Sequence, residues 1–182
     1  MREIPRDILN RAANGDINAF ESLYRDACGF AYSVALRITC NKEDAEEVIQ
    51  DAFIKIYKDL KNFEFKSSFK TWVYRIVANT AINLTKKKLK GTQGHIEYDD
   101  GIDARASQEA SRVKIEEHEK KDLVSSLLSG LNPDHRACVV LRNIQGLSYQ
   151  EIADTLNINL NTVRTRLRRA REAISARFKE KR

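Results

Sequence analysis

The sequence predicts an all-α protein with two small helical domains joined by a flexible linker. Three observations support this prediction. Apolar residues recur every three or four positions over long stretches, only 7 of the 182 residues are glycine and 2 are proline, and the helical period stops between residues 91 and 111. The hydrophobic share of 42% is sufficient for packed cores. We therefore expect domains at residues 1–90 and 112–182, with the linker at 91–111.

The first domain contains one short and three long predicted helices. The segments are a short amphipathic helix at Ile4–Asn14, long helices at Ala19–Thr39, Asn41–Leu60 and Phe69–Lys88, and a loop at Lys61–Ser68. In each long helix the apolar residues follow the spacing that places them on one face. Gly15 and Asp16 end the short helix, and Asn18 is a candidate cap for the next one. Trp72, on the apolar face of the third long helix, is expected to be a core residue.

The linker and the start of the second domain are marked by turn residues. Gly91 to Ser111 contains three glycines and three aspartates without helical period. Arg112–Ser129 then recovers the period and predicts a helix. Pro133 stands at the first position of a short buried helix expected at Asp134–Asn143.

The last part of the chain predicts a helix-turn-helix. Its first helix is expected at Tyr149–Leu156, with Ser148 and Glu151 at the spacing of a capping box. Asparagines between residues 157 and 161 suit a turn, and a second helix follows from about Thr162. The apolar seam of this helix consists of Val163, Leu167, Ala170 and Ile174, and arginines occupy the remaining surface. A braced, arginine-rich second helix is typical of a helix that enters the DNA major groove, whereas the simpler interpretation is a solvated face.

Acidic and amide side chains gather at the start of the second long helix. Glu46, Glu47, Gln50 and Asp51 stand there beside the apolar Ile54. Acidic residues near a helix N-terminus stabilise the helix through its dipole, which is one explanation. The other is a docking face for a basic protein partner. The residues alone favour neither explanation.

The third long helix combines basic, amide and aromatic residues. Lys70, Arg75, Asn79 and Asn83 lie along its polar side. Basic side chains hold a phosphate backbone, and amides and aromatic rings recognise unpaired bases, so this helix suits single-stranded or melted nucleic acid. The alternative is a solvated basic helix.

Composition narrows the class of protein further. The net charge of +6 suits a polyanionic partner. The three cysteines, Cys28, Cys40 and Cys138, are widely spaced and are expected to be reduced thiols, and we expect no metal site and no cofactor. No apolar run approaches the length of a membrane span and the N-terminus lacks a signal-peptide core, so we expect a cytoplasmic protein without membrane insertion. Paired carboxylates at metal spacing, a phosphate loop and an activated nucleophile are all missing, so we do not expect an enzyme such as a nuclease.

Taken together, these segments resemble an extracytoplasmic-function (ECF) sigma factor, a small two-domain promoter-specificity subunit of bacterial RNA polymerase. The stretch from Asn41 to Phe53, NKEDAEEVIQDAF, is similar to region 2.2 of the family. Phe69 to Asn83 resembles regions 2.3 and 2.4. Leu131 to Arg136, LNPDHR, and the helix-turn-helix resemble region 4. The resemblance covers nearly the whole chain.

The resemblance implies a role for each of three groups of residues. The first group would bind core RNA polymerase: Glu47, Gln50 and Asp51. The second would read and hold the melted minus-ten strand: Phe65, Lys66, Ser67, Ser68, Lys70, Arg75, Asn79 and Asn83. The third would contact the duplex minus-thirty-five element, Arg166 and Arg171 through phosphates: Arg164, Thr165, Arg166, Arg169 and Arg171. The loop departs from its relatives, which often have a glycine and an acidic residue where this chain has Phe65 and Lys66.

The implied partners are core RNA polymerase, promoter DNA as duplex and as melted strand, and an anti-sigma factor that covers both DNA-binding domains. The function would be promoter recognition in transcription initiation. The alternative is a free-standing helix-turn-helix regulator that binds duplex DNA as a dimer. That alternative explains the C-terminal part of the chain but leaves the basic helix near Trp72 without a role.

Overall fold

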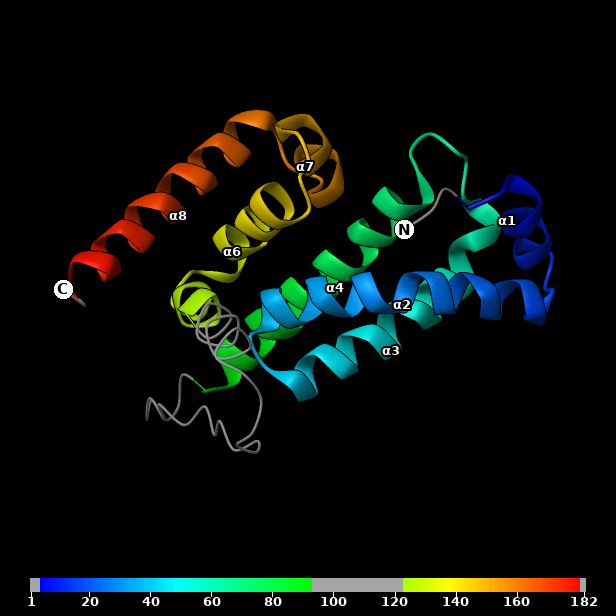
Figure 1. Ribbon diagram of the computed structural model, residues 1–182, viewed down its shortest axis with the longest axis horizontal. Coiled ribbons are helices and arrows are strands. Elements are labelled where there is room, and N and C mark those ends of the chain that lie inside the picture. The colour runs from blue at the N-terminus through cyan, green and yellow to red at the C-terminus, as the bar shows by residue number, and fades with distance from the viewer. Residues whose placement is uncertain (1–3, 93–122, 181–182) are drawn as a thin grey trace, which may run out of the picture.

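The computed structural model describes residues 4–92 and 123–180, and in these two ranges the chain forms helices and no strand (Figure 1). This confirms the all-α prediction. The elements in the first range are α1 Arg6–Ala13, α2 Ile17–Thr39, α3 Lys42–Asp59, the 3-10 turn η1 Leu60–Asn62 and α4 Phe69–Thr92. Those in the second range are a helical segment at 123–129, α6 Pro133–Val139, the π-helical turn η2 Val140–Ile144, α7 Tyr149–Leu156 and α8 Leu160–Glu180. Most of the predicted linker and the first part of the helix expected at Arg112–Ser129 lie outside the described residues.

The first range forms a bundle in which α2, α3 and α4 pack side by side and α1 lies against one end of α2 (Figure 1). The predicted apolar faces of the long helices supply its core. Large side chains without solvent contact include Leu23, Ile38 and Ile56. Burying such a side chain contributes about 1.5–3 kcal/mol, so this shared core is the main source of the bundle's stability.

Two local predictions in this bundle need correction. The cap of α2 is Asp16 rather than Asn18, because the Asp16 carboxylate accepts the Ala19 amide and is fixed by Arg11, whose Nη2 lies 2.7 Å from Oδ2. Helix α4 continues to Thr92, past the predicted end at Lys88. A glycine such as Gly91 costs a helix about 1 kcal/mol but does not stop it.

The second range consists of the helical segment at 123–129, the largely buried helix α6 continued by η2, and the helix-turn-helix. Asn132 caps α6, and the chain then widens into the π-helical turn η2 where the sequence had predicted one continuous helix. The capping box of α7 is present as predicted, and Asn157 ends this helix in the left-handed conformation with φ of 51°. The Asn159 side chain accepts the Thr162 amide at 2.7 Å, so α8 begins at Leu160, two residues before the predicted start.

The two ranges pack directly against each other. Helix α4 contacts α6 and α7, and α2 contacts α6. The Arg136 guanidinium is 5% exposed and donates to the carbonyl of Ile38 at 2.7 Å across the interface, while its other terminal nitrogen donates to Ser129 and Leu131. The buried apolar residues of both ranges form one continuous cluster. The helix-turn-helix is therefore held against the first bundle.

Candidate nucleic-acid interface

Helix α8 presents the surface expected of a DNA-reading helix. Val163, Leu167 and Ala170 are buried beneath it, which holds the opposite face in solvent. Four of the five residues assigned to duplex recognition are exposed, and the fifth, Arg166, is half-buried. The exposed four are Arg164, Thr165, Arg169 and Arg171. Guanidinium and hydroxyl groups on one exposed helical surface suit contacts to phosphates and base edges.

The arginines of this surface differ in their intramolecular contacts. Arg164 Nη1 donates to the Asn161 side chain at 3.1 Å, and Arg171 Nη2 donates to the Tyr149 hydroxyl at 3.1 Å. Arg166 lies 3.2 Å from the Asp134 carboxylate. The hydrogen bonds of Arg164 and Arg171 are exposed and are easily exchanged for bonds to a phosphate. Arg166 would first have to break its ion pair with Asp134.

A hollow of about 550 Å³ opens beside the first half of α8. It is lined by Thr165 and Arg169 together with polar residues that the sequence had not suggested: Asn132, His135, Asn159, Asn161 and Thr162. Burial and the charges of Arg166 and Arg169 lower the pKa of His135. The sequence carried no direct signal for these residues, because the start of α6 meets the start of α8 only in the folded chain.

The residues assigned to the melted strand are placed less uniformly. Arg75 and Asn83 are exposed on α4, and Lys70 is half-buried with its ammonium 5.6 Å from the centre of the Tyr74 ring. Asn79 is half-buried, and its Nδ2 donates to the Thr155 carbonyl of α7 at 3.3 Å. In this arrangement the Asn79 side-chain amide is therefore already hydrogen-bonded to α7, and the other residues of the group remain accessible.

The loop before α4 is exposed and includes an unusual backbone conformation. Phe65 has a φ of 57°, a region that favours glycine, which agrees with the glycine often found at this place in the related family. Lys66 lies 2.5 Å from the Glu64 carboxylate. The Ser68 hydroxyl accepts the Thr71 amide at 3.1 Å and so contributes to the start of α4. The loop thus combines a strained aromatic residue, an ion pair and a structural serine.

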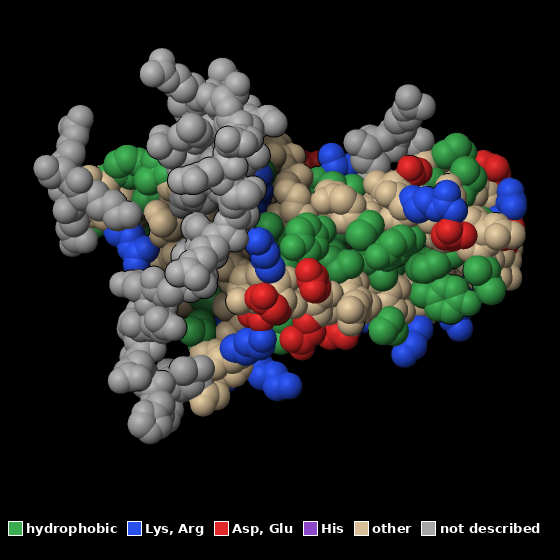
Figure 2. Space-filling model, turned by 60° about the horizontal axis from the view of Figure 1, so that its bottom comes forward, with side chains coloured by type: hydrophobic (Ala, Val, Ile, Leu, Met, Phe, Trp, Pro, Cys, Tyr) green, Lys and Arg blue, Asp and Glu red, His purple; other side chains and the backbone are tan. Residues whose placement is uncertain are grey.

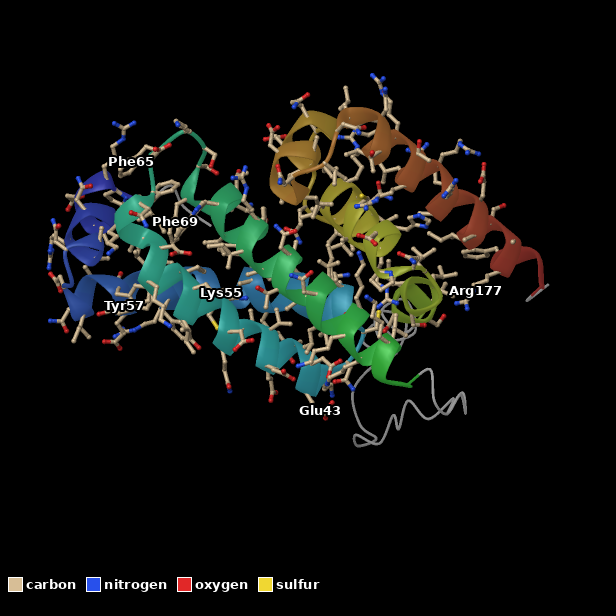
Figure 3. The ribbon with its side chains drawn as sticks, turned by 180° about the vertical axis from the view of Figure 1, so that it is seen from behind. Glu43, Lys55, Tyr57, Phe65, Phe69 and Arg177 are labelled. Atoms are coloured by element: carbon tan, nitrogen blue, oxygen red, sulfur yellow. The ribbon has the colours of Figure 1, made fainter. Side chains whose placement is uncertain are left out.

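Aromatic rings support this loop from below. The centre of the Phe63 ring lies 5.1 Å from that of Trp72 and 4.8 Å from that of Phe65. Phe69 completes the cluster, with its ring centre 6.1 Å from that of Phe63, and is buried. Figure 3 labels Phe65 and Phe69 toward this end of the molecule. Trp72 is half-buried and packed against the core, as the sequence predicted.

The expected docking face on α3 is exposed. Glu47, Gln50 and Asp51 all point to solvent. Figure 2 shows acidic side chains beside a stripe of hydrophobic ones on this side of the molecule. Ile54 and Tyr57 are 52% and 49% exposed and extend the surface along α3. Tyr57 was not among the residues expected at this face, although it lies three residues after Ile54 and seven after Gln50 and therefore on the same side of α3.

Within residues 4–92 and 123–180, three side-chain polar contacts link α4 to the elements that follow residue 123. Besides the bond made by Asn79, the Tyr74 hydroxyl donates to Gln145 Oε1 at 2.6 Å, and Lys86 Nζ lies 2.6 Å from the Asp134 carboxylate. Burial raises the pKa of Tyr74 to about 12, so its hydroxyl remains a donor at neutral pH. Asp134 is shared by Lys86 and Arg166. Helices α4 and α8 therefore contact the same carboxylate.

The cysteines match the expectation of free thiols. Cys28 and Cys40 are half-buried, Cys138 is buried, and none forms a disulfide. Burial raises the pKa of Cys138 to about 11 and also raises that of Cys40. In the ranges 4–92 and 123–180, side chains do not gather into a metal-binding group, and none of the helices there is both long and apolar enough to cross a membrane.

Comparison with known proteins identifies the family of the chain. The chain matches two family models, sigma-70 region 2 over residues 23–90 and sigma-70 region 4 over residues 121–174. The RNA polymerase sigma-H factor of Pseudomonas aeruginosa is 32% identical, over 95% of this chain and 93% of that protein. The ECF RNA polymerase sigma-E factor of Escherichia coli K12 is 33% identical, over 92% of this chain and 90% of that protein.

The fold is also found among solved structures. The sigma factor RpoE of Bartonella quintana, crystallised with the anti-sigma factor NepR, superposes with a TM-score of 0.67 at 20% identity, over 91% of this chain and all of that one. Sequence relatives above 30% identity cover nearly the full chain, and both halves match their own family model. The chain therefore belongs to the ECF family of RNA polymerase sigma factors, the non-enzymatic subunits that direct the polymerase to its promoters.

Proposed function

We propose that this sigma factor uses three separate surfaces at a promoter. Glu47, Gln50 and Asp51, extended by Ile54 and Tyr57, bind core RNA polymerase. The loop 65–68 and the polar side of α4 hold the melted minus-ten strand. The exposed side of α8 and the hollow beside it bind the minus-thirty-five duplex. The first two surfaces belong to a domain of residues 1–90 and the third to a domain of residues 112–182. The protein acts in the cytoplasm.

The observation that carries this proposal is the exposure pattern of α8. Its apolar seam is buried while Arg164, Thr165 and Arg169 face solvent on one side. A solvated basic helix without a ligand needs neither a braced partner helix nor a polar hollow. Both are present here, and both fit a helix that lies in a major groove.

The proposal requires the two halves of the chain to separate. The minus-ten and minus-thirty-five elements are about 25 base pairs apart, which is roughly 85 Å along straight duplex DNA at 3.4 Å per base pair. Helices α4 and α7 are in direct contact in this structure, so they cannot occupy both elements at once. The bond from Asn79 to the Thr155 carbonyl must also break before Asn79 can meet a base. The arrangement described here is thus a closed form, and the active form is open.

An anti-sigma factor fits this scheme as a regulator. One similar structure, that of the Bartonella quintana sigma factor RpoE, is a complex with an anti-sigma factor. A protein that binds across α4 and the second half of this chain would stabilise the closed form by its differential affinity for it. Its release would leave the sigma factor free to open.

Reconstituted transcription tests the proposal. The full chain is mixed with bacterial core RNA polymerase and the DNA upstream of its own gene. Promoter-specific transcripts are expected, and their absence from that DNA and from a library of genomic fragments would contradict the proposal. The Asp51→Arg variant should bind core polymerase at least tenfold more weakly, because it reverses a charge in the docking face. Asp26→Arg, an exposed acidic position on α2, serves as the matched control.

The free-standing regulator is the competing function. It predicts a dimer that binds palindromic duplex DNA tightly without polymerase. The exposed docking face of α3 and the family membership favour the sigma factor. Sedimentation of the protein with duplex DNA, with and without core polymerase, separates the two functions.

A further inference from the structure

Thr155 of α7 buries a hydroxyl group that has no hydrogen-bond partner. Its side chain is 0% exposed, and within residues 4–92 and 123–180 no atom donates to Oγ1 or accepts from it. A threonine hydroxyl can donate one hydrogen bond and accept others, and it bonds to water wherever water reaches it. Because most buried polar groups in folded proteins are hydrogen-bonded, this exception calls for a physical explanation.

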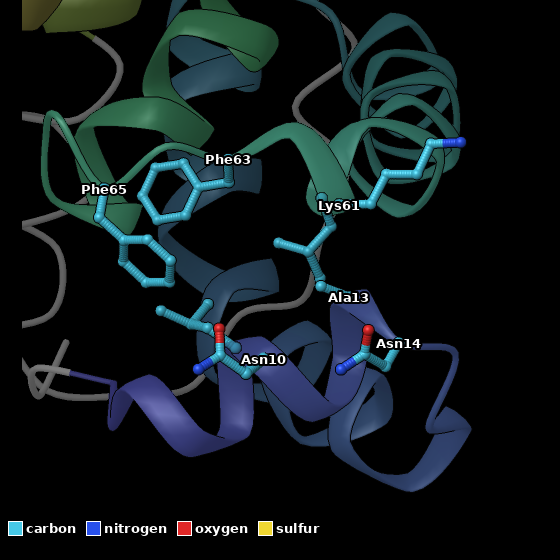
Figure 4. Close-up of a pocket in the computed structure, with 8 residues that line it drawn as sticks. Asn10, Ala13, Asn14, Lys61, Phe63 and Phe65 are labelled. Carbon is cyan, nitrogen blue, oxygen red and sulfur yellow. The ribbon is translucent and has the colours of Figure 1, made fainter.

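Other polar groups of the molecule that lack a protein partner are in a different position. Asn10 and Asn14 are exposed at a pocket between α1 and the loop after η1, where water can bond to them (Figure 4). Arg136 Nε is buried without a hydrogen bond, but the same guanidinium donates to three carbonyls through its other nitrogens. The hydroxyl is the only polar group of the Thr155 side chain, so no second bond offsets its burial.

Thr155 lies where α7 meets α4. Its main-chain carbonyl accepts the Asn79 side chain of α4, and the two helices are in direct contact. Glu151, one turn earlier on the same side of α7, is exposed, so α7 alone leaves this side of the helix in solvent. The burial of Thr155 therefore belongs to the contact between the two halves of the chain.

Hydrogen bonding gives little to the contact at this point. The Asn79 bond measures 3.3 Å, whereas bonds of this kind are usually about 2.9–3.0 Å. The contacts of Tyr74 and Lys86 elsewhere on α4 both measure 2.6 Å. Where α4 covers α7, the closed form thus gains one long bond and removes a hydroxyl from water.

We propose that the Thr155 hydroxyl destabilises the closed form and so keeps it easy to open. In the closed form the hydroxyl loses water without compensation, and in the open form water bonds to it again, so the group favours opening. A valine has the same shape without this disadvantage. The inference rests on the proposed function, because the two halves must separate at a promoter. It adds a residue whose role is to set the ratio of the two forms.

Opening can be followed in the full-length protein by single-molecule energy transfer between dyes at positions 87 and 168, in a chain whose three native cysteines have been replaced. We would measure the open-to-closed ratio of the free protein. We would also measure the concentration of core polymerase, with a promoter fragment selected by reconstituted transcription, that opens half of the molecules. In Thr155→Val the ratio should fall roughly tenfold. Where the closed form predominates, the half-opening concentration should rise by the same factor.

Two control variants isolate the effect of the hydroxyl. Thr155→Ser keeps the hydroxyl and loses a buried methyl group, so it should open at the wild-type concentration or below. Thr85→Val removes a hydroxyl that has a partner, because Thr85 Oγ1 donates to the Ala81 carbonyl at 2.8 Å within α4. This variant should leave the open-to-closed ratio unchanged. Urea unfolding of all variants measures their stability and shows that they are folded.

Three results would overturn the proposal. The first is a Thr155→Val variant that opens at the wild-type concentration. The second is a Thr155→Ser variant that needs as much polymerase as Thr155→Val. The third is a Thr155→Val variant that resists urea better than the wild type while its opening is unchanged, because the hydroxyl would then be buried within one half alone.

The same experiment separates this failure from failure of the proposed function. If the wild type opens at its promoter and Thr155→Val opens equally well, the hydroxyl has no role and the function stands. If no fragment supports transcription, or the wild type stays closed on an active one, the proposed function fails in its requirement for opening. The open-to-closed ratio of the free protein then still decides the role of the hydroxyl, measured in a Gln145→Ala background that lacks the acceptor of Tyr74.

Discussion

The side-chain amide of Asn79 donates to the main-chain carbonyl of Thr155, with the two atoms 3.3 Å apart. These residues are far apart in sequence and belong to the two helices that would meet different parts of a promoter. The Asn79 amide can therefore either bond to Thr155 or recognise a base, but it cannot do both at once.

Weakening the interface should favour the open form. In Gln145→Ala, the buried hydroxyl of Tyr74 loses its acceptor at 2.6 Å, which should cost the closed form about 1–2 kcal/mol and raise the open-to-closed ratio roughly five- to thirtyfold. Small-angle X-ray scattering should then show a larger mean radius of gyration. Gln150→Ala, on the exposed side of α7, is the control and should scatter like the wild type. An unchanged radius in Gln145→Ala would mean that this contact does not hold the halves together.

The buried guanidinium of Arg136 should be important for stability. Arg136→Met keeps the length of the side chain but leaves the carbonyls of Ile38, Ser129 and Leu131 without their donor. We expect a loss of about 3 kcal/mol or more in the free energy of unfolding, measured by urea denaturation. Arg168→Met, whose guanidinium pairs with Glu172 at the surface, should lose less than about 1 kcal/mol. Equal losses in the two variants would contradict the structural role of Arg136.

The backbone of Phe65 should reverse the usual order of alanine and glycine. Both Phe65→Ala and Phe65→Gly remove the ring, but only glycine adopts a φ of 57° without strain. The glycine variant should therefore be more stable than the alanine variant by roughly 1 kcal/mol, the cost of a left-handed conformation for an L-residue. Thermal unfolding of the two variants measures the difference. A more stable alanine variant would show that Phe65 does not hold this conformation in solution.

Duplex binding should depend on pH through His135. Burial and the neighbouring Arg166 and Arg169 lower its pKa, so the imidazole is neutral at pH 7 in the free protein. DNA phosphates in the adjacent hollow would raise that pKa, so binding takes up a proton and its affinity should increase as the pH falls from 7.5 towards 6. The slope is expected to vanish in His135→Gln. Titration of a minus-thirty-five duplex at several pH values measures it, and a wild type with no slope would place His135 away from the DNA.

The local parts of this account could be predicted from the sequence because they depend on short-range chemistry. The capping box of Ser148 and Glu151 and the buried seam of α8 are set by spacing alone. The choice of Asp16 over Asn18 was missed because both are good caps. Arg11 forms an ion pair with Asp16, and this pair exists only when the turn after α1 brings the two side chains together.

The contacts between the two halves could not be predicted in the same way. Gln145 and Thr155 carry no periodic signal, and their partners Tyr74 and Asn79 lie in another part of the chain. The sequence suggested which residues meet DNA but not that one of them is occupied by the protein itself. Likewise, His135 becomes a candidate only when α6 is placed against α8.

The distance between α4 and α8, measured by pulsed electron resonance, shows whether the two halves of the chain separate at a promoter. Spin labels would be placed at Lys87 and Arg168, both exposed, in a chain whose three native cysteines have been replaced. We predict one short distance for the free protein and a shift of several tens of ångströms when core polymerase and promoter DNA are added. The same short distance in the complete promoter complex would contradict the opening that this account requires.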